Sequence, residues 1–412
     1  MNCLSPQKCA ATLPEPLLGI STLVRLVYDQ GDITPVWDGL MARLGANPGD
    51  TSALMDVSVL LQTTGQREKG LELQSAAIAT QPVYRRVHGN GRGLRIIAFV
   101  TAGDMMANTP IDFLLEGSDV TLYFVYVDAK TRRLPELPDA DVAFMAIGES
   151  AGNRAVLENI GWLLLDWQGP PILNGAPEHI SMMTRDGVHS LLAEEPSIVS
   201  PPNVPASRTD LADICQNPAC LESLLPGADF PLIIRPIGTH AGHGMEKLDD
   251  LAALGAYLAR HADAQFYLAP FIDYSGPDGL FRKQRVVFIN GRAFASHYAV
   301  SEHWMVHYLS ASMVENAERR NEEAEWMRTF DEDFARRHAT SIDALCRCFG
   351  LDYFGVDCAE MPDGRLLVFE ADVAMIVHDM DSELVFPYKK PAMRKLFRAF
   401  HAALAEAGGH TA

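Results

Sequence analysis

The chain has 412 residues, of which 48% are hydrophobic and 21% are charged, a composition that is ordinary for a globular enzyme of about two to four domains. Its formal net charge of −19 argues against a protein that wraps nucleic acid, because counterion release requires clustered Lys and Arg. An anionic ligand must therefore be met by local positive charge or by a metal ion.

The sequence contains no apolar run as long as a signal peptide or a membrane span, so we expect a cytoplasmic protein without a membrane partner. Its seven cysteines have no regular spacing, which is typical of free thiols in packing roles rather than of a disulfide framework.

Residues 50–80 show the apolar pattern of two short amphipathic helices, the first of which Asp50 can cap. This hairpin resembles a tetratricopeptide repeat, although most of the aromatic signature positions are absent. We assign residues 1–88 to a helical, tetratricopeptide-like segment. Because one such unit cannot bury its own apolar face, we expect it to pack on an upstream helix within residues 17–44 or on the rest of the protein.

Apolar runs of strand length follow a glycine-rich junction at residues 88–93 and alternate with helical segments. This alternation favours a parallel sheet with helices on its faces, and hence a small doubly wound α/β domain at residues 89–185. A Pro- and Ser-rich loop at residues 196–207 marks the next boundary. The expected strands are Leu94–Val100, Val120–Val127, Val142–Ile147 and Pro171–Leu173, and the expected helices are Ile111–Glu116 and Gly152–Leu165.

The strand Phe230–Pro236 has a buried-type pattern, contains Arg235, and runs into a glycine-rich loop at residues 238–244. Glycines at this spacing let backbone N–H groups approach an anion, with the cation beside them. The pattern predicts a phosphate-covering flap, and a plain turn between strands is the alternative. It is not a Walker A loop, because no Gly-Lys-Ser or Gly-Lys-Thr follows.

A hairpin at residues 281–292 places Lys283 and Arg285 on one face through the alternation of side chains along a strand. Two cations in an apolar hairpin are costly unless an anion meets them. The alternative is a pair of solvated residues at a sheet edge.

A second hairpin, Leu351–Asp372, carries the carboxylates Asp357, Glu370 and Asp372. Alternation puts the last two on one face, and the turn at residues 362–364 folds the first strand back beside them. Mg²⁺ prefers carboxylate oxygens together with phosphates. The hairpin therefore predicts a magnesium site, with a solvated acidic turn as the alternative.

The order of these segments over roughly residues 94–400 resembles the ATP-grasp superfamily of carboxylate–amine and carboxylate–thiol ligases. Its most specific part is the spacing of the three carboxylates, which matches that of the family's metal ligands. The resemblance also includes the segment Asn174–Asp186. It implies an α/β protein in which a two-lobed α+β ATP-grasp module, with a central lobe at 186–270 and a C-terminal lobe at 271–412, follows the helical hairpin and the doubly wound domain.

Carried over residue by residue, the resemblance implies that Arg235 contacts ATP phosphate and that Arg285 holds an acyl phosphate. The carbonyl of Pro270 and the N–H of Ile272 would read adenine. The implied catalytic residues are Arg235 and Arg285; the implied nucleotide-binding residues are Arg235, Gly238, Thr239, His240, Gly242, His243, Gly244, Pro270, Phe271, Ile272 and Lys283; the implied Mg²⁺ ligands are Asp357, Glu370 and Asp372.

Three positions depart from the family pattern. Arg235 stands where Lys is usual, Ala269 stands where an acidic or amide side chain is common, and Asp372 stands where Asn is usual. The last change adds a negative charge, so it favours retention of metal binding.

We therefore expect an ATP- and Mg²⁺-dependent ligase that joins a small-molecule or peptide carboxylate to an amine through an acyl phosphate and releases ADP and phosphate. A homodimer is the family expectation. The alternatives are an ATP-binding scaffold or sensor that recruits a protein partner through residues 1–88, and a phosphotransferase acting on a hydroxyl. His303, His307 and His378 fall in polar clusters near the expected cleft, where satisfied polar residues are more frequent than catalytic ones.

Overall fold

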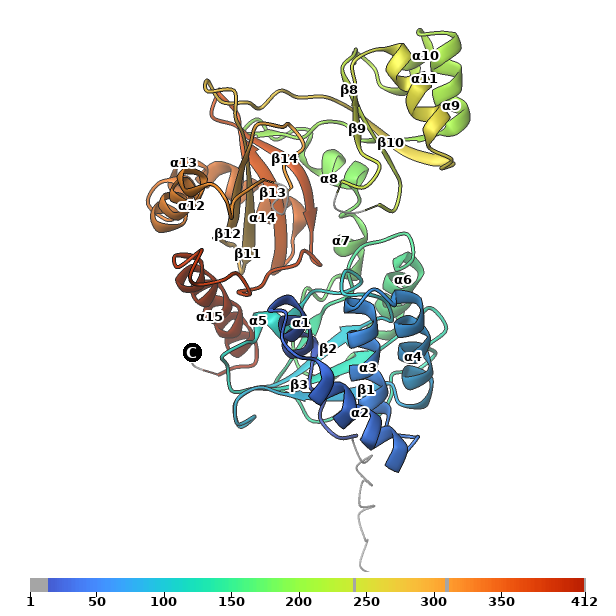
Figure 1. Cartoon of the computed structure of the whole chain (residues 1–412), viewed down its shortest axis with the longest axis vertical. Helices are drawn as coiled ribbons and strands as arrows, with labels where there is room; N and C mark the ends of the chain where they lie inside the picture. Colours follow the sequence, from blue (N-terminus) through green and yellow to red (C-terminus); the bar gives the residue numbers. More distant parts are fainter. Residues whose placement is uncertain (1–13, 240–241, 308–310, 411–412) are drawn as a thin grey trace, which may run out of the picture.

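The computed structural model describes residues 14–239, 242–307 and 311–410. Within them the chain has an α/β fold in which N-terminal helices precede three sheets, two of which mix parallel and antiparallel strands (Figure 1). The expected α/β class with N-terminal helices is confirmed.

Four helices form the N-terminal part, and their apolar sides share one core. Asp50 caps α3 by accepting a hydrogen bond from the N–H of Ala53 at 3.0 Å. Leu23 and Leu40 of the first two helices pack with Leu60 of α3, so the expected helix pair and its packing on upstream helices are confirmed. The likeness to a tetratricopeptide repeat stays a prediction. The helices are α1 (Ile20–Tyr28), α2 (Thr34–Ala46), α3 (Thr51–Thr63) and α4 (Arg67–Thr80).

The first sheet has the strand order β1-β3-β2-β4-β5, and all neighbours are parallel except β1, which runs antiparallel to β3. Its four parallel strands and two helices confirm the expected elements of residues 94–175. The antiparallel edge strand was missed, because it lies within the segment that we expected to be helical. The elements are β1 (Val83–Val87), β2 (Arg95–Val100), α5 (Ile111–Leu114), β3 (Thr121–Tyr126), β4 (Val142–Met145), α6 (Arg154–Leu163) and β5 (Ile172–Leu173).

The second sheet is antiparallel, with the order β7-β10-β8-β9, and one face packs on the helices α9, α10 and α11. Two short helices precede it. The expected loop at residues 196–207 was partly wrong, because it contains the strands β6 and β7. The elements are α7 (Pro177–Ser181), α8 (Arg185–Leu192), β7 (Val204–Ser207), α9 (Arg208–Gln216), α10 (Cys220–Leu224), β8 (Leu232–Pro236), β9 (Glu246–Leu248), α11 (Leu251–Arg260) and β10 (Gln265–Pro270).

The third sheet has the order β12-β11-β13-β14-β6 and contains both expected hairpins, which are confirmed. Helices α12 to α14 connect the two hairpins, and α15 ends the chain. The elements are β6 (Ile198–Val199), β11 (Phe281–Ile289), β12 (Arg292–Ser301), α12 (Ala317–Thr329), α13 (Phe334–Arg337), α14 (Ala339–Phe349), β13 (Tyr353–Glu360), β14 (Leu366–Asp372) and α15 (Lys389–Ala407).

Helix α15 joins the first and third sheets through aromatic side chains. Phe400 packs edge-on against Phe144 of β4 and Tyr353 of β13, with ring centroids 5.4 and 5.3 Å apart, and all three side chains are buried. Burying a large aromatic side chain stabilises a fold by roughly 2–3 kcal/mol. The two sheets therefore share a core, which fixes the third sheet relative to the N-terminal part.

The five cysteines in the described part of the chain, Cys215, Cys220, Cys346, Cys348 and Cys358, carry free thiols. None of the helices that the structure describes is both long enough and apolar enough to cross a membrane.

Candidate active site

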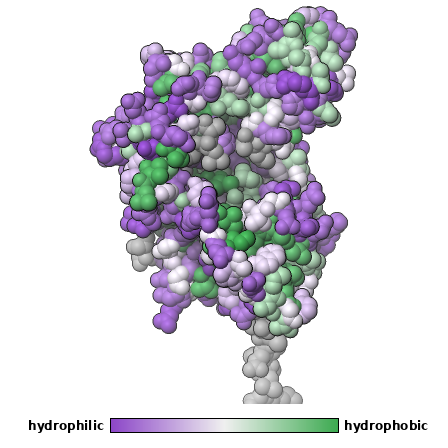
Figure 2. All heavy atoms as spheres, in the orientation of Figure 1, coloured by the Kyte–Doolittle hydropathy of each residue, from purple (hydrophilic) through white to green (hydrophobic). Residues whose placement is uncertain are grey.

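A cavity of about 620 Å³ lies between the second and third sheets. One wall comes from β8 and β10, and the other comes from β11, β13 and β14. Met106, in the loop that follows β2 of the first sheet, also lines the cavity, so the first sheet contributes to its wall. Figure 2 shows that this face of the molecule is hollowed between its upper and lower parts, with hydrophobic side chains on the walls of the hollow.

The cavity is lined by both positively and negatively charged side chains. Among its described lining residues, four are cations from both walls and three are carboxylates from the third sheet. This local excess of positive charge contrasts with the net charge of −19 of the whole chain. The cavity therefore suits an anionic ligand. The cations are Arg185, Arg235, Lys283 and Arg285, and the carboxylates are Asp357, Glu370 and Asp372.

Three of these side chains form a row across the third sheet. Asp357 of β13 lies directly opposite Arg285 of β11 on one side and Glu370 of β14 on the other. Residues opposite one another on adjacent strands point to the same face, so the pairing itself brings them together. Lys283 lies two residues before Arg285 and shares its face, as expected.

Asp357 is the centre of a buried ion-pair network. Its side chain has no exposed surface and accepts from Arg285 at 2.7 and 3.0 Å, while the Nζ of Lys283 lies 2.6 Å from its Oδ2. The two cations are only 21% and 18% exposed, so they are not solvated edge residues. The anion that they meet is a side chain of the same sheet.

The three carboxylates differ in their electrostatics. Burial opposes ionisation of Asp357, but Arg285 and Lys283 outweigh it and hold the pKa of this carboxyl below its usual range. Burial likewise opposes the charge of Glu370, and its ion pair with Arg185 lowers the pKa overall. For Asp372, burial raises the pKa to about 7, with a further contribution from Glu370. Two carboxylates are thus held ionised at neutral pH and the third is near its midpoint.

The predicted magnesium site stays a prediction. All three carboxylates line the cavity, and their oxygens are the ligand type that Mg²⁺ prefers. However, among residues 14–239, 242–307 and 311–410 no three His, Cys, Asp or Glu side chains are grouped closely enough to hold a metal ion. Each oxygen of Asp357 already has a cationic partner. Binding by all three carboxylates therefore requires a rearrangement that brings Asp357, Glu370 and Asp372 closer together.

The predicted flap follows β8. Positive φ values of 81°, 73° and 69° at Gly238, Gly242 and Gly244 are conformations that favour glycine. Gly242 lines the cavity, whereas Gly238 and His243 are exposed and do not. His240 lies outside the described residues.

Arg235 links the start of this flap to the cavity. Its guanidinium donates to the carbonyl of Thr239, and the hydroxyl of Thr239 donates to the carbonyl of Pro236 at 2.9 Å. Burial lowers the pKa of Arg235 to about 10, and Arg185 adds to the effect. Arg235 therefore remains charged at neutral pH and faces the cavity that contains the other cations.

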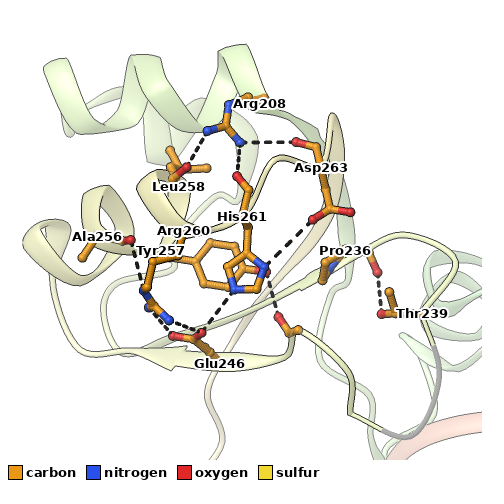
Figure 3. Close-up of polar contacts among 11 residues, drawn as sticks. Arg208, Pro236, Thr239, Glu246, Ala256, Tyr257, Leu258, Arg260, His261 and Asp263 are labelled. Carbon is orange, nitrogen blue, oxygen red and sulfur yellow. Dashed lines mark hydrogen bonds and ion pairs between the residues drawn. The ribbon is translucent and has the colours of Figure 1, made fainter.

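The far end of the flap is attached to α11 and β9 (Figure 3). The hydroxyl of Tyr257 donates to the carbonyl of Gly244 at 2.7 Å, and its ring stacks on His261 with centroids 4.1 Å apart. Glu246 accepts from Arg260 at 2.8 Å and lies 3.4 Å from the Nε2 of His261. The hydroxyl of Tyr257 and the polar cluster of Glu246, Arg260 and His261 thus fix the end of the flap, where the chain enters β9.

The expected hinge lies on the cavity wall at the end of β10. Ala269, Pro270, Phe271 and Ile272 all line the cavity. The N–H of Phe271 donates to the carbonyl of Pro231 at 3.0 Å, so this donor is already used within the sheet. The roles of Pro270 and Ile272 toward a nucleotide stay predictions.

The three histidines are placed differently. His307 lines the cavity, and burial followed by Lys283 lowers its pKa. His303 is exposed and does not line it. His378 is half-buried, and its Nδ1 accepts from the N–H of Met380 at 3.1 Å, as expected of a satisfied polar residue.

Among the cavity residues that the sequence analysis missed, Arg185 and Met106 are the most informative. Arg185 ion-pairs with Glu370 and donates to the carbonyl of Phe369 at 3.4 Å. No local pattern indicates that a residue at the start of α8 meets β14. Met106 could have been predicted from its position. Ligands of open α/β sheets bind beyond the carboxyl ends of the parallel strands, and Met106 follows β2.

No protein-family model and no curated protein matches this sequence. Solved structures of ATP-grasp ligases match about three quarters of the chain. A RimK domain protein ATP-grasp from Sphaerobacter thermophilus has 15% identity and a TM-score of 0.38, with 75% of this chain and 98% of that chain covered. The D-alanine–D-alanine ligase from Bacillus anthracis complexed with ATP has 14% identity and a TM-score of 0.41, with 77% and 97% covered. The VanG D-Ala:D-Ser ligase from Enterococcus faecalis has 12% identity and a TM-score of 0.44, with 76% and 100% covered. At these TM-scores, the function has to be inferred from the residues of the cavity.

Proposed function

We propose that this chain is an ADP-forming ligase of the ATP-grasp type, which joins a carboxylate to an amine to give an amide or peptide-like bond. The observation that carries this proposal is the cavity between the second and third sheets, where cations from both walls face three carboxylates of one sheet. Such a mixture suits a polyphosphate with a divalent metal better than it suits either alone.

The walls also support a purine nucleotide as the ligand. Ile233, Ile272, Leu367 and Phe369 give the cavity an apolar part, whereas Arg235 and the glycines after it suit phosphate. The proposed nucleotide-binding and catalytic residues are those of the expected set that line the cavity, with Arg185 added as a further cation: Arg235, Gly242, Pro270, Phe271, Ile272, Lys283, Arg285 and Arg185.

The proposed reaction has two displacement steps. The substrate carboxylate attacks the γ-phosphorus of ATP, ADP leaves, and an acyl phosphate forms. The amine then attacks the acyl carbon, loses a proton, and displaces phosphate. Arg235 and Arg285 would neutralise charge on the transferred phosphoryl group, and the flap would exclude water from the acyl phosphate. Mg²⁺, which Asp357, Glu370 and Asp372 would hold, would supply further charge neutralisation.

A turnover screen tests this proposal. Purified protein is incubated with Mg-ATP and a panel of carboxylates, amino acids and peptides, and both ADP and condensed products are measured, the latter by mass spectrometry. The proposal expects substrate-dependent ADP release with a product of matching mass. Absence of ADP above background across the panel, together with no effect of Glu370→Ala, would contradict it.

One observation favours a second candidate, an ATP-binding scaffold or sensor without turnover. Both oxygens of Asp357 are engaged by Lys283 and Arg285, an arrangement that holds the site in place without a metal. Tight ATP binding with no ADP release from any substrate would favour this candidate. A phosphotransferase would instead give a phosphorylated product in the same screen.

We also propose a cytoplasmic location and a homodimer. Cell fractionation tests the location, since recovery with membranes would contradict it. Light scattering coupled to size-exclusion chromatography tests the assembly, and a monomer mass of 45.2 kDa at all concentrations would contradict the dimer.

A further inference from the structure

Two loops that line the cavity are contacted on their other side by the N-terminal helices α1 and α4. The β2 loop, residues 101–109, carries Met106, and the β14 loop, residues 373–381, carries Met375 and Ile376; all three side chains line the cavity. Neither loop contains a residue of the expected hinge or flap.

Helix α4 holds the β2 loop. The side-chain amide of Gln74 donates to the carbonyl of Gly103 at 2.9 Å and accepts from its N–H at 2.8 Å, and Gln74 is only 7% exposed. Arg67 lies 2.7 Å from Asp104, which in turn accepts from the N–H of Met106 at 3.0 Å. A buried amide and an exposed ion pair therefore fix the backbone on either side of the loop's turn.

Helix α1 holds the β14 loop. Arg25 ion-pairs with Asp379 of this loop and, at 2.5 Å, with Glu116, which lies between α5 and β3. The side chain of Val24 packs in a small buried cluster with Met380 and Phe113. Helix α1 thus contacts a loop far away in the sequence, since Arg25 and Asp379 are separated by 354 positions.

The two loops also contact each other and the ion-pair network. The hydroxyl of Thr109, at the end of the β2 loop, donates to the carbonyl of Val373 at 2.8 Å. On the cavity side, the guanidinium of Arg285 donates to the carbonyl of Ile376 at 3.1 Å. The β14 loop thus lies between helix α1 and a cation of the cavity.

We propose that helices α1 and α4 are an internal support for the end of the cavity that selects the carboxylate or amine substrate, with Gln74 and Arg25 as positioning residues. The assignment of this end to those substrates rests on the proposed ligase function, whereas the support of the loops does not. On this proposal the helices act within the chain, because the polar side chains of Arg25, Arg67 and Gln74 already contact the loops.

Hydrogen–deuterium exchange tests the support without requiring activity. In Gln74→Ala, removal of two hydrogen bonds should make exchange in the β2 loop about tenfold faster. In Arg25→Ala, the same is expected in the β14 loop. The matched control is Arg43→Ala, which removes the ion pair at 2.8 Å between Arg43 of α2 and Asp50 at the start of α3, two helices that pack with α1 and α4, and should leave both loops unchanged.

Unchanged exchange in both loops of both variants would overturn the proposal. Equal acceleration in the Arg43→Ala control would also overturn it, because the effect would then reflect general loosening of the helices. Should Gln74→Ala not fold, Gln74→Glu gives the same test, since it keeps the acceptor for the N–H of Gly103 and loses the donor to its carbonyl.

Kinetics separate positioning from a merely structural role. Once a substrate pair is known, Gln74→Ala and Arg25→Ala should raise the KM of the carboxylate or amine about tenfold and leave the KM of ATP within about twofold. Arg25→Lys should restore part of the loss. An equal rise in both KM values would overturn the assignment to the substrate end. Faster loop exchange in a chain without any turnover would leave the support standing and count against the ligase function.

Discussion

The two walls of the cavity are held in different ways. On the third sheet, Arg285, Asp357 and Glu370 lie in one row of paired strands, and Asp357 has no exposed surface. On the second sheet, the flap is held at its ends by Arg235 and by the hydroxyl of Tyr257. One wall is therefore organised by an ion-pair network around a buried carboxylate, so we expect its loss to lower stability. The other is fastened by few contacts, so we expect their loss to act mainly on ligand binding.

The largest expected effect is on the carboxylate wall. Asp357→Ala removes a fully buried anion from two cations that are 21% and 18% exposed, and the loss should be about 3 kcal/mol, the lower end of the range for buried ion pairs. Urea denaturation should show this loss in the free energy of unfolding. Asp363→Ala is the control in the same hairpin, because its ion pair with Arg365 is exposed, at 51% and 45% of the two side chains, and should leave the free energy of unfolding nearly unchanged. Equal losses in the two variants would remove the distinction between the walls.

The next effect separates two carboxylates of β14. Glu370→Ala should lower ADP release about a hundredfold, because it removes an ionised group of the proposed metal site and leaves Arg185 unpaired. Asp372→Asn should keep the rate within about threefold, because amide oxygen can also ligate Mg²⁺. Similar losses in both variants, measured by coupled ADP assay, would count against distinct roles.

On the flap wall, Arg235→Ala should weaken ATP binding about tenfold, since a charged hydrogen bond to phosphate contributes about 1.5–3 kcal/mol and part of it can be replaced by neighbouring cations. Arg235→Lys keeps the charge and should bind ATP within about threefold of the original chain. Isothermal titration calorimetry measures both. Wild-type affinity in the alanine variant would show that this cation does not meet the nucleotide.

The smallest effect is expected at the far end of the flap. Tyr257→Phe removes the hydrogen bond to Gly244 and keeps the ring that stacks on His261. Loss of one such bond, about 1 kcal/mol, should make hydrogen exchange in residues 242–246 about fivefold faster without lowering the melting temperature by more than about 2 °C. A large loss of stability with unchanged exchange would show that this wall, too, is held by burial.

The carboxylate wall was more predictable than the flap wall, for a physical reason. Alternation along a strand and a tight turn determine which side chains of a hairpin share a face, so Lys283, Arg285 and the carboxylates could be grouped from the sequence. The strand register then places Asp357 directly opposite Arg285, so their side chains meet on the same face of the sheet. For the flap wall, by contrast, the glycines in the sequence predict only that unusual backbone conformations are accessible.

Contacts between distant segments could not be predicted in the same way. Arg185 reaches Glu370, and Arg25 reaches Asp379, only because the sheets and α15 bring their elements together. Neither pair has a local pattern, since any exposed-type cation on an amphipathic helix looks the same in the sequence. The antiparallel strand β1 escaped notice for a related reason: its residues Val83–Val87 pair with β3 across a long sequence separation.

Strand β1 has a practical consequence for any experiment that removes the N-terminal segment. A truncation at residue 88 would strip β3 of its antiparallel neighbour and leave a row of unpaired N–H and C=O groups, which is a template for aggregation. A partner gained or lost after such a cut would report on the exposed sheet edge and not on docking by the helices. A cut placed before Pro82 keeps this edge covered, so it is the truncation with which recruitment by α1–α4 can be judged.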